Sequence, residues 1–393
     1  MFKHLFKLIW NKKKQNFLLM TEMLFSFLVL FAVFSMLVYY YTNYKKPMGM
    51  DYRHAWLVQY NNTYETKNTD SLNLYYQTLQ KMMRAMPEVQ EVSLCSDNVP
   101  FSSNMNGGTI KYGKLAAGTN NYTVDDNYSK AFNTQQLEGR WFNKSDAVGK
   151  YPAIVINNNL KQELFGDAPA VGKLLTDDYR KSTMRIVGVI QGQKFKGDYA
   201  PSGNAVYFRT DTGSYRWMGN MIVKVTPAAD AAFEARLYKM LSNYMKKSNI
   251  SIEHFVNKRK NINYFQLVPM IVMSIVGCFL IINVALGLFG VLWYNINKRR
   301  GEIGLRRAVG ATGNSVSSQL ITESLILATF ALIIGSFFAV QFPILNVFNL
   351  QAGIYITAML LAIVFIYLLV LLCSLYPGRQ AAAIYPAVAL HEE

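Results

Sequence analysis

Four stretches of the chain consist almost entirely of apolar residues, and each is long enough to cross a lipid bilayer, which takes about 20 helical residues. Between the first two stretches, short runs alternate apolar with polar positions or repeat apolar residues at helical spacing, as in water-soluble domains. The pattern therefore predicts a membrane protein with four transmembrane α-helices plus a large extracytoplasmic α+β domain. The predicted spans are residues 17–41, 265–293, 318–342 and 353–376.

The first apolar stretch has two interpretations. Lysines at positions 12–14 precede it, as basic residues precede the core of a secretory signal peptide. However, the apolar run is longer than such a core, and the sequence YYYTNYKK after it offers no small residues for cleavage. We therefore expect a retained membrane anchor.

Basic residues in the short connections predict the orientation of the spans, because such residues stay on the cytoplasmic side. Five lysines precede the first span, and five basic residues lie between the second and third spans, whereas the connection at 343–352 has no charge. We expect both termini, as residues 1–16 and 377–393, and the loop 294–317 to be cytoplasmic. Residues 42–264 are then extracytoplasmic.

Two features adjoin the spans. Residues 2–10 place Phe2, Leu5, Phe6 and Ile9 at helical spacing, which predicts an amphipathic helix on the inner membrane surface. A frayed basic start is the alternative. The second span is longer than a bilayer requires, and the sequence upstream of it could extend the helix as a stalk.

Residues 42–264 begin and end with a similar pattern. A strand is predicted at 54–60, a helix at 71–86 capped by Asp70, and a strand at 89–95. Near the other end, a strand at 221–225, a helix at 229–245 and a strand at 249–255 follow the same order. We expect the two β-α-β units to pack together as one α+β subdomain.

Residues from about 100 to 215 interrupt these units and are rich in Gly, Asn, Thr and Tyr, with short apolar alternations that predict a β-rich insertion. His54 and His254 stand alone, and no nucleophile or metal-binding motif is present. We expect no catalytic residue and no metal site, and hence no enzyme activity in this chain. The three cysteines are far apart, so no disulfide is expected within the domain.

The net charge of +16 raises the question of nucleic acid. The basic residues are spread over the external domain and the cytoplasmic segments, and they form no dense arm interleaved with aromatic residues. We therefore expect the basic residues to contact membrane lipid and not nucleic acid.

Six motifs in one order resemble a known family. They are LEGRWFNKSDA (137–147), YPAIVINNNLKQELFG (151–166), PAVGK (169–173), RIVGVI (185–190), RRGEIGLRRAVGAT (299–312) and YPGRQAAAIYPAVALHEE (376–393). The chain resembles the MacB-type ABC transporter permeases, with an FtsX-like C-terminal membrane region. One departure is Ala170, where the motif often has proline. A second is the absence of a fused nucleotide-binding domain before the first span.

The resemblance implies that the pair of β-α-β units is a porter-like subdomain, and it also implies a mechanism and partners. A permease of this kind pairs with a second permease subunit, either a copy of itself or a paralogue, and with ABC ATPase subunits that move its helices. Because this sequence has no GxxxxGK[ST] phosphate loop, we expect the ATPase to be a separate protein that holds the ATP and Mg. The chain itself would need no cofactor. A periplasmic adaptor and an outer-membrane channel are further candidate partners, and the bacterial inner membrane is the expected location.

The cytoplasmic loop divides into two parts. Lys298, Arg299 and Arg300 suit charge anchoring at the membrane surface, whereas the block from Glu302 to Gly310 suits a coupling helix that docks in an ATPase. In that block, Glu302 and Arg306 form an i,i+4 ion pair, and Gly304 and Ala308 form a strip that another backbone could approach. The expected coupling residues are Glu302, Ile303, Gly304, Leu305, Arg306, Arg307, Ala308, Val309 and Gly310.

Three polar residues fall in the predicted spans. Glu22 and Glu323 lie near cytoplasmic ends, where they could reach the interface, and Glu323 could instead pair with Arg306 or Arg307. Asn283 could hydrogen-bond across a subunit interface or within its own subunit.

Several functions fit these features. Export or efflux driven by the mechanical transmission of ATP-powered motion is the main hypothesis, and release of lipoproteins to a periplasmic carrier is an alternative within the same class. An FtsX-like regulator of cell-wall hydrolases, which transports nothing, is a second class. A membrane sensor that works without ATP is a third, and it leaves the coupling block unexplained.

Overall fold

A computed structural model describes residues 13–383, apart from residues 62, 63, 65, 67, 97, 104, 178 and 211–213. The chain divides into two units. The strand-rich unit is Asn43–Gln266, and the helical unit comprises Met1–Thr42 and Leu267–Glu393. The predicted amphipathic helix at residues 2–10 lies outside the described residues.

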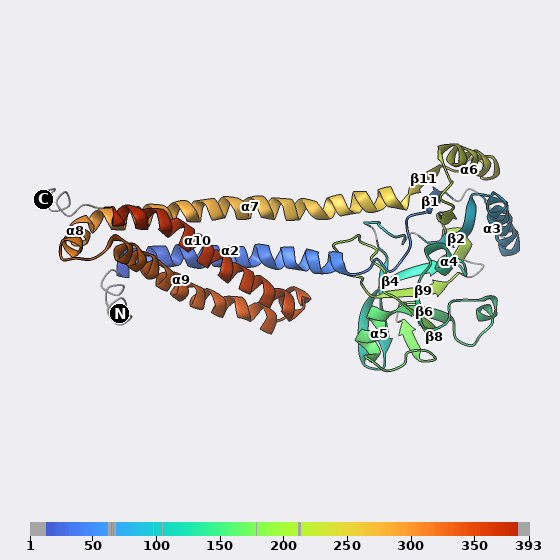
Figure 1. The fold of residues 1–393 in the computed structure, drawn as a ribbon. Coiled ribbons are helices and arrows are strands. Elements are labelled where there is room, and N and C mark those ends of the chain that lie inside the picture. Colours follow the sequence, from blue (N-terminus) through green and yellow to red (C-terminus); the bar gives the residue numbers. More distant parts are fainter. Residues whose placement is uncertain are drawn as a thin grey trace. The chain divides into compact units, whose positions relative to one another are not determined.

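The helical unit is built on four long helices, each apolar enough to cross a membrane (Figure 1). They are α2 (Lys13–Lys45), α7 (Phe255–Lys298), α9 (Gly313–Ile344) and α10 (Ala352–Ala382). Each contains one predicted span and is longer than it. The predicted stalk is the N-terminal part of α7, which is one continuous helix of 44 residues. At 1.5 Å per residue it is about 66 Å long, roughly twice the hydrocarbon thickness of a bilayer.

The helices α9 and α10 pack along much of their length (Figure 1). Buried alanines face this contact, including Ala328 and Ala331 on α9 and Ala358 and Ala362 on α10. Small residues let helix backbones approach closely. Such packing matters in a membrane, because lipid tails are as apolar as the side chains and the hydrophobic effect does not drive helices together. A short 3-10 turn, η3 (Val347–Asn349), connects the two helices, and the short helix α8 (Arg300–Ala308) connects α7 to α9.

The strands of the two predicted β-α-β units interleave in one sheet, where β10 of the second unit lies between β1 and β2 of the first. Its strands follow the order β11-β1-β10-β2, all antiparallel. The elements are β1 (Ala55–Tyr60), α3 (Thr69–Arg84), β2 (Val89–Cys95), β10 (Asn220–Val225), α6 (Ala231–Tyr244) and β11 (Ile250–His254). The helices bury their apolar stripes in one core with the strands, which includes Trp56, Tyr76, Val223 and Leu237. This arrangement confirms the predicted α+β fold.

One detail of the prediction is wrong. The residue that caps α3 is Asn68, because its side-chain oxygen accepts hydrogen bonds from the backbone N–H groups of Asp70 (2.9 Å) and Ser71 (3.2 Å). Asp70 lies inside the first turn, where its charge still suits the positive end of the helix.

The insertion is rich in strands, as predicted, and these strands form a closed ring of pairings, β4-β3-β7-β8-β6-β9 and back to β4. Its elements are β3 (Gly107–Tyr112), β4 (Leu115–Val124), α4 (Tyr128–Phe132), β5 (Gln136–Gly139), η1 (Lys144–Ala147), β6 (Ala153–Asn157), α5 (Asn158–Phe165), β7 (Leu174–Asp177), β8 (Ser182–Ile190), β9 (Ala205–Arg209) and η2 (Ser214–Trp217). Closure leaves the ring without an unpaired edge, which is one way that β proteins avoid aggregation. A pairing of β2 with β4 joins the ring to the four-stranded sheet.

Candidate functional site

The predicted coupling block folds as the helix α8 and the residues just after it. The helix begins at Arg300, two residues before the predicted block. Gly310 follows the helix with φ of +105°, in the left-handed region where glycine is favoured, and it ends the segment as expected.

Charged and polar side chains connect α8 to both neighbouring helices. Glu302 pairs with Arg306 at 2.7 Å, the predicted i,i+4 contact, and with Arg299 at 3.2 Å. Arg299 also contacts Glu323 on α9 at 2.9 Å. The Gln319 amide completes the set, since it accepts from Arg306 (2.9 Å) and donates to Glu323 (3.0 Å). We call these five residues, Arg299, Glu302, Arg306, Gln319 and Glu323, the α8 cluster.

The proposed pairing of Glu323 with Arg306 or Arg307 is wrong. Its partner is Arg299, which lies at the break between α7 and α8 and reaches α9 from there. Arg307 donates instead to the Ala382 carbonyl at the end of α10. The assignment of Arg299 to general charge anchoring therefore missed a specific contact, for which its i,i+3 spacing to Glu302 was the available signal.

The helix α8 has one buried and one open face. Ile303 packs in a small core with residues of α7, α9 and α10, and Gly304 beside it is also buried. Leu305 is 57% exposed and Val309 is 83% exposed. The predicted strip of Gly304 and Ala308 is therefore wrong, because Gly304 faces its own chain. We define the open face of α8 as Glu302, Leu305, Ala308 and Val309, which are all exposed.

The other polar residues of the spans make contacts within the chain. Glu22 on α2 lies directly against Gly287 on α7, so that a Cβ atom at position 287 would collide with its carboxylate. The Asn283 amide donates to the Phe279 carbonyl of its own helix at 2.7 Å. This bond satisfies one donor of Asn283 without a second subunit.

A second polar site lies in the strand-rich unit, in the loop of residues 191–199 after β8, which we call the strap. Lys194 in this loop is only 2% exposed. Its ammonium donates to the backbone carbonyls of Asn43, Lys46 (2.5 Å) and Asp198 (3.2 Å). The first two carbonyls lie at the C-terminal end of α2, where the backbone has unpaired acceptors and a partial negative charge.

The strap also binds the beginning of α7. The Asp198 carboxylate accepts two hydrogen bonds from Arg259, at 2.9 and 2.5 Å, and one from Asn263 at 2.8 Å. Asn263 in turn accepts from the Asp198 N–H at 2.9 Å. Gly197, with φ of +92°, packs so closely against Asn263 that a side chain there would collide with it. One loop thus contacts the end of α2 and the first turns of α7.

The pKa values of Lys194 in the strap and of Arg259, which binds the strap, are shifted in opposite directions. Burial lowers the pKa of Lys194 below its ordinary value of 10.5, and the Asp198 carboxylate partly offsets this effect. Hydrogen bonds from Arg259 to Asp198 raise the pKa of that guanidinium. The strap is not recognisable in the sequence, because its partners lie far apart along the chain. The only local signal is a lysine and an aspartate in a loop with glycines after an apolar strand.

Within the part of the chain that the structure describes, no group of three or more His, Cys, Asp or Glu side chains could hold a metal ion. The sites above therefore consist of ion pairs, hydrogen bonds and one exposed apolar surface.

Four membrane-length helices and a large α+β domain define a multi-pass membrane protein with a folded domain outside the spans. Comparison with protein families identifies both parts. Residues 25–239 match the MacB-like periplasmic core domain, and residues 274–386 match the FtsX-like permease C-terminal region. The chain belongs to the MacB-like family of ABC transporter permeases.

Individual relatives agree with this assignment. The chain is 24% identical over 241 residues to the macrolide export ATP-binding/permease protein MacB 1/2 of Paracoccus denitrificans, covering 60% of this chain and 36% of that protein. It is 27% identical over 308 residues to the MacB of Rhodopseudomonas palustris strain BisB18, covering 72% and 45%. The chain thus spans less than half the length of these relatives.

Among solved structures, the periplasmic region of MacB from Actinobacillus actinomycetemcomitans is similar, with a TM-score of 0.39 and 15% identity. The match covers 56% of this chain and 98% of that one.

Proposed function

We propose that this chain is the permease subunit of an ABC transporter, and that it transmits motion from a separate ATPase to its strand-rich domain to drive export. The observation that carries this proposal is the open face of α8. It presents Leu305 and Val309 to solvent at a turn between two membrane-length helices, where an anchoring loop would need only charge.

The α8 cluster supports a mechanical role for this helix. Arg299 joins α8 to α9 through Glu323, and Gln319 provides a second connection from Arg306. A partner that moves α8 would therefore displace α9 as well, and α7 through the chain itself. Bidentate and charge-assisted bonds of this kind hold geometry more firmly than single neutral ones.

The strap supports the other end of the same mechanism. The end of α2 and the first turns of α7 bind to the same loop of the strand-rich unit, through Lys194 and Asp198. Both helices also contribute residues to the helical unit. Movement along either helix would reach the strand-rich domain through this loop, and movement along α7 would also reach it through β11.

The proposed partners follow from this mechanism. ATP and Mg would bind to the ATPase subunit, since the 393 residues contain no phosphate loop. A second permease subunit, either a copy or a paralogue, would complete the membrane part, with both termini in the cytoplasm. A periplasmic adaptor and an outer-membrane channel would receive the exported molecule. The macrolide export named for the relatives supports export of small molecules as the task.

Copurification tests the docking surface. The tagged full-length chain is extracted in detergent from the cells that produce it, and bound proteins are identified by mass spectrometry. We expect an ATPase with a Walker phosphate loop to copurify with the wild type and to be lost in Leu305→Asp, because the charge disrupts an apolar contact. Leu115→Asp is the matched control, since Leu115 is 53% exposed and lies on β4 of the strand-rich unit.

The control should retain the ATPase. Equal recovery with Leu305→Asp, or the absence of any Walker-motif ATPase from the wild-type sample, would contradict the proposal. Normal thermal unfolding of Leu305→Asp in detergent would show that the loss is not caused by misfolding.

A further inference from the structure

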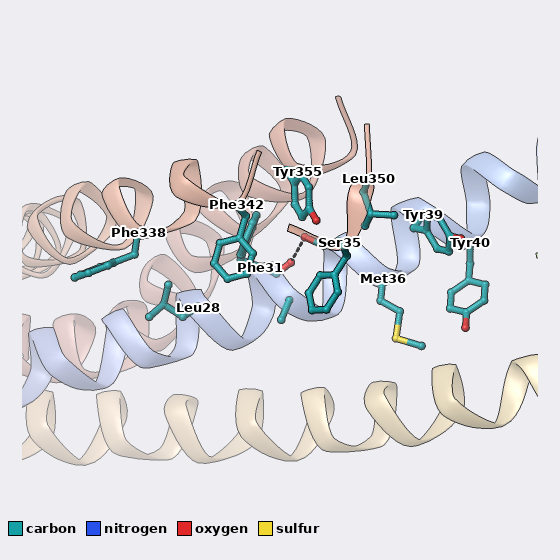
Figure 2. Close-up of a pocket in the computed structure, with 12 residues that line it drawn as sticks. Leu28, Phe31, Ser35, Met36, Tyr39, Tyr40, Phe338, Phe342, Leu350 and Tyr355 are labelled. Atoms are coloured by element: carbon teal, nitrogen blue, oxygen red, sulfur yellow. Dashed lines mark hydrogen bonds between the residues drawn. The ribbon is translucent and has the colours of Figure 1, made fainter. Parts of the chain in front are cut away.

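A cavity opens in the helical unit between α2, η3 and the facing ends of α9 and α10 (Figure 2). Its volume is about 620 Å³, within the range of pockets that hold small ligands. Leu28, Phe31 and Met36 of α2 line one side, and Phe338, Phe342 and Tyr355 line the other. Neither the α8 cluster nor the strap contributes to it.

Two of the four hydroxyl groups among the lining residues, those of Ser35 and Tyr355, are directed at the protein itself, and the other two belong to Tyr39 and Tyr40 at one end. The Ser35 hydroxyl donates to the Phe31 carbonyl at 2.7 Å, and the Tyr355 hydroxyl donates to the Val347 carbonyl at 2.5 Å. The surface left for a ligand is therefore almost entirely hydrocarbon and aromatic. A polar ligand would lose its hydration there without compensating hydrogen bonds, which makes an apolar ligand the favoured occupant.

The length of the cavity points to one kind of apolar ligand. Its lining on α2 extends from Leu28 to Tyr40, a distance of about 18 Å at 1.5 Å per helical residue. One leaflet of a bilayer contributes about 15 Å of hydrocarbon, half of the roughly 30 Å core. Tyr39 and Tyr40 lie at one end, and tyrosine is typical of the membrane interface. The cavity thus matches one lipid chain, with its polar end toward the tyrosines.

The loop that closes the cavity has an unusual backbone. Asn346, Phe348 and Asn349 have φ values of +49°, +58° and +52°, in the left-handed region that residues other than glycine seldom adopt. Asparagine adopts this region more readily than other residues do, so the strain falls mainly on Phe348, and strain of this kind is found at ligand clamps. Phe348 is among the side chains that line the cavity, although it is 78% exposed. The strained turn therefore holds a large apolar ring at the cavity instead of turning it into the protein.

We infer that this cavity binds one acyl chain of a membrane phospholipid, held between α2 and the α9–α10 pair. The inference needs the helices to be in a membrane but does not depend on export or on an ATPase. With the orientation proposed above, the chain would come from the periplasmic leaflet.

Native mass spectrometry of the detergent-purified full-length protein tests this inference. After delipidation, the protein is titrated with phosphatidylethanolamine that carries sixteen- and eighteen-carbon chains. We expect one tightly retained lipid per chain in the wild type and at least tenfold weaker retention in Ala32→Trp, because Ala32 lines the cavity and the indole would fill it. Val364→Trp, at an exposed position of α10 outside the lining, should bind as the wild type does.

Two further comparisons identify what is recognised. Phosphatidylethanolamine with six-carbon chains should bind at least tenfold more weakly if the acyl chain is the ligand, whereas equal binding would mean that the headgroup is recognised and would overturn the inference. Equal retention by Ala32→Trp and the wild type would also overturn it. Phe348→Ala should release the lipid faster. Unchanged ATPase copurification with Ala32→Trp would separate this site from the proposed docking surface.

Discussion

The α8 cluster and the strap use the same chemistry in different surroundings. In both, an arginine and a carboxylate connect segments that are far apart in the chain, through Arg299 and Glu323 in one and Arg259 and Asp198 in the other. The α8 cluster adjoins an open apolar face, and its Glu302 side chain is 41% exposed. In the strap, the side chain of Asp198 is 9% exposed, and Lys194 is buried.

This difference in burial implies a difference in role. Exposed ion pairs contribute about 0–1 kcal/mol, because water and salt screen them and because two flexible side chains must be ordered. Buried charged groups cost several kcal/mol to leave unpaired. In the α8 cluster, Arg299 and Glu323 are 11% and 17% exposed, so only the pairs of the exposed Glu302 belong to the weak class. We therefore expect the pairs of Glu302 to rearrange when a partner binds, whereas the strap is a fixed joint. The following predictions test this distinction, beginning with the largest expected effect.

Removal of the strap carboxylate should have the largest effect. Asp198→Ala leaves the Arg259 guanidinium and the Asn263 amide without their main acceptor. We expect a loss of about 2 kcal/mol in the unfolding free energy, the usual worth of hydrogen bonds to a charged group. We also expect loss of ATPase stimulation in the reconstituted complex.

The exposed Asp167, which forms no ion pair within the part of the chain that the structure describes, provides the control as Asp167→Ala. Chemical unfolding of both full-length variants in detergent measures the difference. Equal stability of the two variants would show that the strap is not a fixed joint.

A smaller change in stability is expected at the α8 cluster. Arg299→Gln removes the contacts with Glu302 and Glu323 and should cost about 1 kcal/mol, since the arginine side chain is largely buried but one of its partners is exposed. Coupling to the ATPase should fall more than stability does, because α8 and α9 lose their direct ion pair.

ATPase stimulation and thermal unfolding are compared with those of Lys298→Gln, which removes a neighbouring charge that forms no ion pair with any of the described residues. If Lys298→Gln impaired stimulation as strongly as Arg299→Gln, general charge rather than the specific pair would be responsible.

The smallest expected effect is a pH dependence of the strap. Because the pKa of Lys194 is lowered in the folded protein, the unfolded chain binds more protons between that lowered value and 10.5. Stability therefore gains a contribution as pH rises through this window, and below the window the folded state carries the cost of the buried charge.

Unfolding free energies of the wild type and Lys194→Met, measured from neutral pH up to 10.5, should differ in slope over this window. The wild type should have the more positive slope. Arg299→Gln should leave the slope unchanged, because the α8 cluster contains no lysine. Parallel curves for the wild type and Lys194→Met would contradict the assigned pKa shift.

Periodic patterns made much of the fold predictable. The apolar runs locate the four long helices, and the alternating strands with amphipathic helices locate the two β-α-β units, because burial of one face imposes a fixed spacing. The ends of elements were less predictable. Asp70 and Asn68 are both good capping residues, and only the backbone geometry decides that Asn68 accepts the hydrogen bonds.

The candidate sites were predictable only where their contacts are local. The pair Glu302–Arg306 follows from helical spacing and is present. The orientation of α8 does not follow from helical spacing, because it depends on which face packs against α7, α9 and α10. This packing buries Gly304. The strap could not be predicted from the sequence for a related reason, since residues 43, 194 and 259 lie far apart in the chain and come together only in the folded domain. Spacing along a sequence does not encode such distant contacts.

The passage from β11 into α7 has a mechanical consequence. His254 ends the strand and Phe255 begins the helix, so no flexible linker separates them. Among the described strands, β11 pairs with β1 alone, at the edge of the sheet. A rotation of α7 about its axis would thus act as torque on a single row of backbone hydrogen bonds. The sheet would deform at that row while its interior pairings stay intact. The edge strand would then transmit a twist of the helix to the domain elastically.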